Sequence, residues 1–422
     1  MKKFLIVIIG CGITTIGWSQ EDVVSNVGVM AISPGTVLSV VNDFDNGKEG
    51  NITADGKVYY YGNFNNDNLY YHSKNAKESE AVFSRLVQKN NPQIISGEQP
   101  TEFFNVVLDN DKNGEAFLLT NDMNINGVLD FKRGIVKVDS LQGAVTFHDG
   151  AKAINASDLS YINGVIEKIG KTEFTFPSGH SGFYRYAKIS APKELRDAFE
   201  EKYHFNDKNF FKTHSNKSGI IQAINTSEYW VINKGKTNGD SNILLTLSWD
   251  ERTTLKELLA DKENALHIIR WDAKDKMWVD EGGVADIANK TITTATAVDS
   301  YGFFTLGTVK SDGMLEGDVT IYNFVSVDDG NGQNNFFRID NITRYPNNSV
   351  EVYNRWGVKV YDTSNYNSAG NVFKGYAEGR GIVDRGSKLP SGTYFYILKY
   401  EYTGKGGSRL IKNTGYIHLD SN

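Results

Sequence analysis

The residues of this chain that could perform chemistry are few, and their spacing is not that of a catalytic motif. Nucleophilic hydrolysis needs a serine or cysteine activated by a histidine and an acid. One string, Gly179-His180-Ser181-Gly182, places a serine beside a histidine, but it lacks the G-x-S-x-G spacing of a nucleophile turn. The seven histidines are scattered without metal-ligand spacing, at His72, His148, His180, His204, His214, His267 and His418. We therefore expect no catalytic residue, no metal site and no cofactor.

Two acidic loops have the oxygen spacing with which calcium sites begin. In the stretch 109–114, Asp and Asn alternate before a glycine, but Thr120 stands where a bidentate glutamate would close the loop. The stretch 122–130 has the same alternation, with two amides in place of carboxylates. Ca²⁺ prefers several anionic oxygens, whereas Asn, Asp and Gly are also the residues that tight turns need. The pattern favours plain turns over calcium binding.

The composition predicts an all-β protein. The chain has 422 residues, with 22 Tyr, 23 Phe and 41 Gly, but 7 Pro. Many β-forming residues combined with many turn glycines are typical of short strands. The length is enough for about two to four domains, each with its own core. The formal net charge is −6 and no block rich in Lys or Arg occurs, which argues against nucleic-acid binding.

The N-terminus has the pattern of an export leader. Two lysines precede an apolar run, and Gly17 and Ser19 are small residues at the −3 and −1 positions of a cleavage site. This predicts a signal peptide over residues 1–19 and a mature chain that begins at Gln20. The alternative is a lipoprotein with lipid on Cys11, the only cysteine of the chain. If Cys11 leaves with the leader, the mature chain has no thiol, and core packing alone must stabilise it.

Residues 20–190 are predicted to form a β-solenoid-like head. Short strands alternate with Asn, Asp and Gly turns, and the fragment Ile125–Leu129 returns in similar form at Ile162–Ile166. We interpret this 37-residue offset as one or two coils of a solenoid, in which stacked coils bury what one coil cannot. An irregular β-sandwich is the alternative.

The pattern then changes twice before the C-terminal region. Residues 191–222 are predicted to be a helical connector, because Lys193–Lys202 is charged and has apolar residues at helical spacing. Residues 223–310 are predicted to form a small β-sandwich. Within it, His267–Trp271 and Met277–Val279 should pair as a hairpin.

Two motifs dominate the last hundred residues. The first is Tyr353-Asn354-Arg355-Trp356-Gly357-Val358-Lys359-Val360-Tyr361, and the second is Leu389-Pro390-Ser391-Gly392-Thr393-Tyr394. The first predicts a strand, a turn centred on glycine and a second strand, and the second predicts a strand entered through a Pro-Gly turn. The alternation of Thr393–Tyr402 places several tyrosines on one face, which favours a packed sandwich core over a binding surface.

The order "NRWG-x-KVY … LP-x-GTY-x-Y" resembles the gliding-motility-associated C-terminal domain, which is the type B sorting domain of the type IX secretion system. The resemblance covers 311–422 and implies a third domain, a β-sandwich that directs export. By this resemblance the residues that carry secretion-signal recognition are Tyr353, Asn354, Arg355, Trp356, Gly357, Lys359, Val360, Tyr361, Leu389, Pro390, Gly392, Thr393 and Tyr394. The 223–310 block is similar to modules that often precede such domains.

The head carries a second resemblance. Phe174–Gly179 followed by Gly182–Arg185 is similar to a phrase of flavobacterial-type surface adhesins, although Tyr186 stands where that phrase has proline. The two resemblances together imply a protein of the cell surface, associated with the outer membrane, that acts as an adhesin or binding component in gliding motility. The implied partners are the outer-membrane barrel of the translocon, its cargo shuttle protein and a PorP/SprF-type anchoring barrel. A surface polysaccharide or a protein is the expected ligand of the head. The alternative is a secreted enzyme that cleaves polysaccharides in a solenoid cleft.

Overall fold

The computed structural model describes residues 23–86, 90–139, 141, 143–218, 220–236, 238–239, 241–263, 265–309, 319–327, 334–378, 385–404 and 407–421. The predicted leader with Gly17, Ser19 and Gln20 lies outside these residues. The chain divides into two compact units. Unit 1 comprises the residues up to Phe205 together with Trp230–Ile243, and unit 2 comprises Asn206–Tyr229 and Leu244–Asn422. Among the described residues, no helix has the length and apolar character needed to cross a bilayer.

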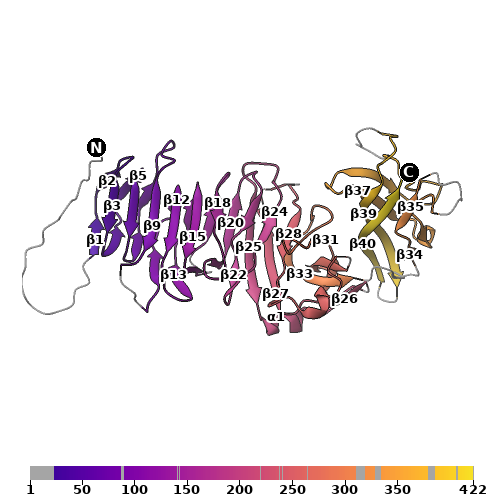
Figure 1. The fold of residues 1–422 in the computed structure, drawn as a ribbon, viewed down its shortest axis with the longest axis horizontal. Helices are drawn as coiled ribbons and strands as arrows, with labels where there is room; N and C mark the ends of the chain where they lie inside the picture. The colour runs from indigo at the N-terminus through magenta and orange to yellow at the C-terminus, as the bar shows by residue number, and fades with distance from the viewer. Residues whose placement is uncertain are drawn as a thin grey trace, which may run out of the picture. The chain divides into compact units, whose positions relative to one another are not determined.

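Unit 1 is a parallel β-solenoid of about six coils, so the predicted fold class is confirmed. In Figure 1 the coils follow one another from indigo to magenta. The first sheet contains β1 (Val23–Asn26), β4 (Asp43–Asn46), β7 (Phe64–Asn66), β10 (Gln93–Ser96), β13 (Glu115–Leu119), β16 (Ile135–Val138) and β19 (Ile162–Asn163). The second face has β2 (Val29–Ile32), β5 (Asn51–Ala54) and β8 (Leu69–Tyr71), then β11 (Thr101–Phe103), β14 (Met123–Ile125), β17 (Val145–Phe147) and β20 (Ile166–Ile169). The third sheet contains β3 (Val37–Val40), β6 (Lys57–Tyr60), β9 (Glu80–Ser84), β12 (Asn105–Asp109), β15 (Val128–Arg133) and β18 (Lys152–Ile154).

A ladder of buried asparagines fixes the register of the first coils. Asn26, Asn46 and Asn66 recur every 20 residues, each at the end of its strand. The Asn26 amide donates to the Asn46 side-chain oxygen at 2.8 Å, and the Asn46 amide donates to that of Asn66 at 2.7 Å. A buried amide without a partner is costly, so each coil supplies the partner that its neighbour needs. Beside the ladder, the rings of Phe44 and Phe64 stack with their centroids 5.9 Å apart.

The repeated fragment does not mark equivalent positions of the solenoid. Ile125 ends β14 on the second face, whereas Ile162 begins β19 in the first sheet. Residues that pair between neighbouring strands of one sheet are one coil apart, which is 20 positions for Val24 and Phe44. The solenoid prediction was right, but the 37-residue offset is not a whole number of coils, because similar short strands occur on more than one face.

The helix predicted within the 191–222 connector was wrong for Lys193–Lys202. Ala198–Phe205 forms strand β25, which pairs antiparallel with β20 and closes the second face of the solenoid. Phe199, Glu201 and Tyr203 are buried in alternation, so period 2 prevailed over the helical spacing. The helix of this region is α1, Lys208–Thr213, which is capped by the Asp207 side chain.

Shorter strands complete unit 1. They are β21 (Phe174–Phe176), which pairs with β24 (Ala187–Ile189), and the hairpin of β22 (Gly179–His180) and β23 (Phe183–Tyr184). Strand β27 (Glu228–Lys234) has residues in both units.

The first part of unit 2 is antiparallel. One sheet contains β26 (Ile221–Ile224), β33 (Gly302–Val309), β29 (Leu266–Asp272) and β30 (Met277–Asp280), and the other contains β28 (Leu245–Ser248), β32 (Thr291–Thr293) and β31 (Val284–Asp286). The short helix η1 spans Lys256–Leu259. The predicted hairpin is confirmed, with Trp271 opposite Trp278. We call residues 244–309 the module.

The C-terminal domain is a five-stranded sheet with a two-stranded sheet beside it. The larger sheet has the order β35 (Phe324–Ser326), β40 (Gly407–Asp420), β39 (Gly392–Gly404), β37 (Asn348–Tyr353) and β38 (Lys359–Ser364). The smaller sheet is β34 (Thr320–Ile321) with β36 (Ile339–Asp340), and η2 spans Ile342–Arg344. Tyr394, Tyr396, Leu398 and Tyr400 on β39 are buried, so the predicted tyrosine-lined core is confirmed.

Candidate functional site

The first sequence motif forms the hairpin of β37 and β38, and its turn is held by Asn354. The Asn354 side-chain oxygen accepts hydrogen bonds from the backbone N–H groups of Trp356 and Val358, both at 3.0 Å. The Asn354 backbone also bonds Val358 and Gly357. Gly357 has a φ of +73°, a conformation that other residues adopt only with strain. The Asn and Gly of the motif are therefore explained by the turn.

The tryptophan of the motif is exposed at the tip of this hairpin. Trp356 is 70% exposed, and its neighbour Val358 is exposed as well. The Arg355 guanidinium lies 4.3 Å from the centre of the Trp356 ring, which is a cation–π distance. We call Arg355, Trp356 and Val358 the tip. Turn geometry does not require an aromatic ring here, and solvent exposure does not favour one, so the tip has the composition of an interaction hot spot.

The strand residues of the same motif are structural. Val360 and Tyr361 are buried, and the Tyr361 ring packs 5.3 Å from that of Phe373. Lys359 pairs with Glu351 at 2.7 Å across the hairpin. Burial raises the pKa of the Tyr353 hydroxyl, and the Glu351 charge acts in the same direction, so this tyrosine stays neutral.

The second motif leads the chain into the long strand β39. Leu389 and Tyr394 are buried, and the Tyr394 hydroxyl donates to the Pro390 carbonyl at 2.9 Å. Pro390, Gly392 and Thr393 are exposed. The structure places most of the predicted recognition residues of both motifs in turns and core, and it leaves the tip as the large exposed side-chain feature of the first motif.

The C-terminal domain is joined to the module by a buried polar network that the sequence analysis missed. The Lys412 ammonium on β40 lies 2.5 Å from Glu281, whose other oxygen accepts from Arg270 at 2.8 Å. Glu281 is buried and Arg270 nearly so, so water does little to screen these charges. Removing one partner of such a pair costs about 3–5 kcal/mol, because the other charge is left buried and unpaired.

A second branch of the network is centred on Asp280. Its carboxylate bonds the His267 ring at 2.8 Å and accepts from the Thr414 hydroxyl at 2.7 Å and the Gly282 N–H at 2.9 Å. Burial alone would raise the pKa of Asp280, but His267, Thr414 and Gly282 stabilise the carboxylate and bring its pKa below the ordinary value. Asp280 and Thr414 are 134 positions apart in the sequence, so no local pattern could have revealed their contact.

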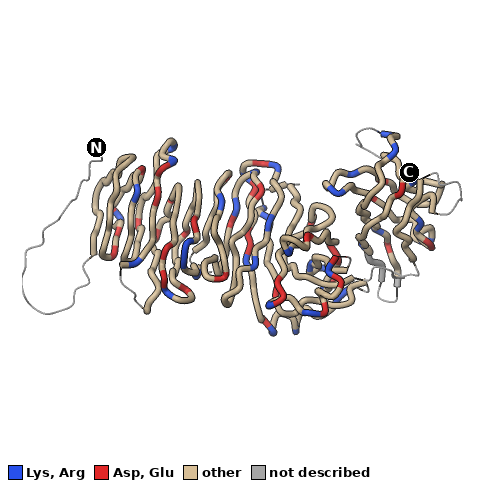
Figure 2. The backbone as a smooth tube through the Cα atoms, in the orientation of Figure 1, with Lys and Arg blue, Asp and Glu red and all other residues tan. Residues whose placement is uncertain are grey.

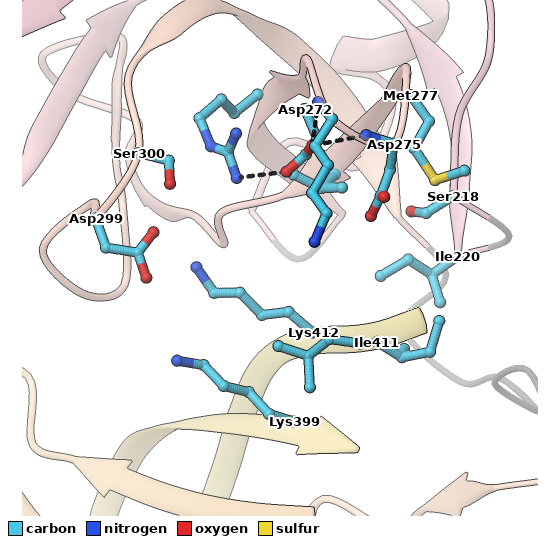
Figure 3. Close-up of a pocket in the computed structure, with 14 residues that line it drawn as sticks. Ser218, Ile220, Asp272, Asp275, Met277, Asp299, Ser300, Lys399, Ile411 and Lys412 are labelled. Atoms are coloured by element: carbon cyan, nitrogen blue, oxygen red, sulfur yellow. Dashed lines mark hydrogen bonds and ion pairs between the residues drawn. The ribbon is translucent and has the colours of Figure 1, made fainter. Parts of the chain in front are cut away.

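Beside this network lies a cavity of about 280 Å³ with charged walls. Figure 3 shows Lys399 and Lys412 extending into the same space, with Asp299 across from them. Asp272 forms an ion pair with Arg270 at 3.6 Å and accepts hydrogen bonds from the N–H groups of its own turn. The cavity is bounded by opposite charges from the module and the C-terminal domain, so we regard it as part of their contact.

The remaining sequence candidates are occupied by structural contacts. His180 accepts a hydrogen bond from the Phe205 N–H, and Ser181 has a positive φ in the turn of β22 and β23. In the 109–114 loop, Asp109 pairs with Arg133 at 2.7 Å. In the 122–130 loop, amides bond Glu102 of the preceding coil. Among the described residues, no three His, Cys, Asp or Glu side chains gather in a way that could hold a metal ion.

Comparison with known families assigns the C-terminal domain. Residues 319–419 match the family model of the CHU_C type IX secretion signal domain. No curated protein and no solved structure matches the chain. The match covers the β37–β38 hairpin with its tip, the second motif and most of β40, which agrees with the resemblance seen in the motifs.

The fold and this match define the C-terminal domain as a sorting domain of the type IX secretion system. The chain is therefore a cargo protein of that system, which interacts with the secretion machinery and is exported to the cell surface or beyond. The head is outside the matched residues.

Proposed function

We propose that this cargo is a surface-displayed binding protein, an adhesin linked to gliding motility, which is delivered and anchored through its sorting domain. Its partners in export are the outer-membrane barrel of the translocon and the cargo shuttle protein, and a PorP/SprF-type barrel anchors it at the outer membrane. The head then holds a ligand outside the cell and performs no catalysis.

The exposed tip is the observation that carries the export part of this proposal. Hot spots of protein interfaces are enriched in Trp and Arg, and the tip presents both, with the guanidinium against the ring on the turn of a hairpin. A tryptophan side chain has only two rotatable bonds, so little side-chain entropy is lost on contact.

The binding role of the head rests on a cleft in unit 1 of about 420 Å³. Lys137, Lys202 and His180 line it, and among the described lining residues Asp139 is the only carboxylate. Burial lowers the pKa of His180, and the charges of both lysines act in the same direction, so its ring is neutral at pH 7. The positive charge comes from the lysines; Lys137 is paired with Glu115 at 3.1 Å, and the charge of Lys202 suits an acidic polysaccharide. Glycoside hydrolysis by the usual mechanism needs two carboxylates, and this lining offers one.

Outward-facing ladders on the solenoid also favour binding over hydrolysis. Asp45 accepts from the Asn65 amide at 2.9 Å, and Asp43 accepts from that of Asn63 at 2.9 Å. These carboxylates are committed to amides of the next coil. At the C-terminal end of β6 the rings of Tyr59 and Tyr61 lie 5.9 Å apart and nearly parallel, which is an arrangement suited to contact with sugars.

Export is tested by a chain that ends at Val309. Without the sorting domain, we expect the protein to accumulate in the periplasm with its leader removed. Protease added to intact cells should then leave it uncut. Surface cleavage equal to that of the wild type would contradict the proposal.

Binding is tested with the full secreted chain, using an acidic uronate polysaccharide and a neutral glucan as probes. Lys202→Glu should weaken binding of the acidic probe, whereas Lys132→Glu, the same charge change at an exposed site on β15, should not. Release of reducing ends or unsaturated products, abolished by Asp139→Asn, would establish the enzyme alternative instead.

A further inference from the structure

The first coil of unit 1 presents three open strand edges. Strands β1, β2 and β3 each stand at the end of their sheet in the described part of the chain. Each has four residues, and none contains proline or a charged residue. Open edges of this kind are templates for pairing with another strand, and proteins usually protect them with charges, proline or bulges.

The side chains of this coil are apolar at positions where the next coil is polar. Val23 lies in register with Asp43, Val29 with Asn51 and Val37 with Lys57. The stretch 23–42 contains no Asp, Glu, Lys or Arg at all. In Figure 2 the coil at the N-terminal end of unit 1 is correspondingly tan, and charged residues colour the coils that follow.

These valines are exposed. Val29 is 86% exposed and Val27 is 72% exposed, and Val23, Val37 and Val41 are exposed as well. Val24 points toward the core, where its neighbour Phe44 is buried, yet Val24 itself is exposed because no further coil covers it in the described structure. A terminal coil of a solenoid normally has a polar outer surface, so this end has the composition of an interface.

The opposite end of the solenoid shows how such an edge is closed in the same chain. There β25 lies antiparallel against β20, with Ile166 opposite Glu201. The strand that closes that edge contains charged residues, Glu200, Glu201 and Lys202. The first coil has no counterpart of this strand among the described residues.

We propose that the first coil pairs with the first coil of a second copy of this chain, in a two-fold, end-to-end dimer. A two-fold axis in the plane of the coil pairs one strand with the same strand of the second copy. Each of the other two strands then pairs with the other one of the second copy. All three contacts are then antiparallel, the direction in which β25 closes β20. Because all three strands have four residues, each edge meets an edge of its own length.

A second copy fits this surface for two further reasons. The coil carries no charge, so two copies do not repel each other, and the surface offers nothing to a partner recognised by its charge. Self-complementary apolar patches are the basis of isologous dimers. Cross-strand pairs of β-branched residues, which the valines would form, are favourable in antiparallel sheets.

The test measures the mass of the full secreted chain by light scattering over a wide range of concentrations. We expect a dimer in the wild type, and Val29→Lys should raise the dissociation constant by roughly tenfold or more, since each dimer would bring two lysines into an apolar contact. Leu159→Lys is the matched control, because Leu159 is 79% exposed elsewhere on the solenoid. This control should leave the dimer intact, and circular dichroism should show that both variants are folded.

Hydrogen exchange of the β1–β3 amides distinguishes this pairing from other coverings of the same surface. In the dimer these amides should be protected, and in Val29→Lys they should exchange fast. A wild type that stays monomeric at all concentrations overturns the proposal. So does protection of these amides in the monomer, which would mean that the segment before Val23 covers the edge. A dimer that Val29→Lys leaves unchanged would place the interface elsewhere and refute the proposal.

Discussion

Replacing Trp356 by alanine should separate folding from export. A fully buried tryptophan costs about 3–5 kcal/mol on truncation to alanine. Trp356 is 70% exposed, so its share of that cost is about 1 kcal/mol, and loss of the exposed cation–π contact with Arg355 adds about 0.5–1 kcal/mol. For a unit of this size 1 kcal/mol shifts the melting temperature by about 2–4 °C. We expect Trp356→Ala to melt about 3–8 °C below the wild type.

The effect on export should be much larger. If the tip is a hot spot, its truncation costs about 2 kcal/mol or more of binding free energy, which is on the order of thirtyfold in affinity for the translocon. Surface display, measured by protease cleavage on intact cells and by immunofluorescence, should fall accordingly, and the protein should accumulate in the periplasm. Trp356→Phe should retain part of the display.

Tyr322 provides the matched control. It is an exposed ring of the same domain, and the Arg338 guanidinium lies 4.8 Å from its centre, so Tyr322→Ala removes the same kind of pair outside the motif. We expect normal display from this variant. Two results would refute the reasoning: wild-type display of Trp356→Ala, or a fall in its melting temperature far beyond the calculated range, which would mean that the ring is packed.

Three further outcomes are expected. Gly357→Val should lower the free energy of unfolding of unit 2 by about 1–3 kcal/mol in a denaturant titration. The cost is backbone strain at a φ of +73°, because the nearest atom to the added Cβ is 3.9 Å away and causes no clash. Gly357→Asn should cost less, because asparagine tolerates this conformation. Because the pKa of Asp280 is lower in the folded state, its carboxylate stabilises unit 2 above the unfolded pKa, and this stability is lost as the pH falls through the folded value. Thermal melts between about pH 5 and about pH 3 should therefore depend more steeply on pH in the wild type than in Asp280→Asn. The intact mass of the exported protein should fit a chain that begins at Gln20 without lipid, and a diacylated chain that begins at Cys11 would overturn the leader assignment.

The sequence was most informative where the signal was local. The β37–β38 hairpin follows from strand residues on both sides of an Asn-x-x-Gly turn. The burial of Tyr394, Tyr396 and Tyr400 follows from strict alternation. The exposure of Trp356 could not be read in the same way, because the alternation of strand faces stops at the turn where this residue lies.

Local signals also misled where two periods compete. In Lys193–Lys202 the apolar residues fit a helix, but the overlapping strand β25 alternates around Glu201, a carboxyl that no helix-based reasoning would bury. Burial raises the pKa of Glu201 well above its ordinary value, so it is buried in neutral form and fits the apolar side of β25. The charge seen in the sequence was therefore not a sign of solvent exposure.

Contacts over long separations had no signal in the sequence. Asp280 and Thr414 meet only because β30 and β40 are folded against each other, and one sequence carries no record of such pairs. The domain boundary predicted at 310–311 falls between two parts that share this buried network, and its exact place stays a prediction.

The asparagine ladder makes the length of the head an adjustable quantity. The Asn26 amide bonds Asn46 and the Asn46 amide bonds Asn66, each across 20 residues, so removal of one such coil would bring Asn26 and Asn66 into the same relation. Neighbouring strands lie about 4.8 Å apart, so each such coil moves whatever the head carries by about that distance. Insertion or loss of whole coils changes reach in steps of this size, without any new core to be packed. For a protein that is exported to the cell surface or beyond, the length of the head can thus vary without disturbing either end of the solenoid.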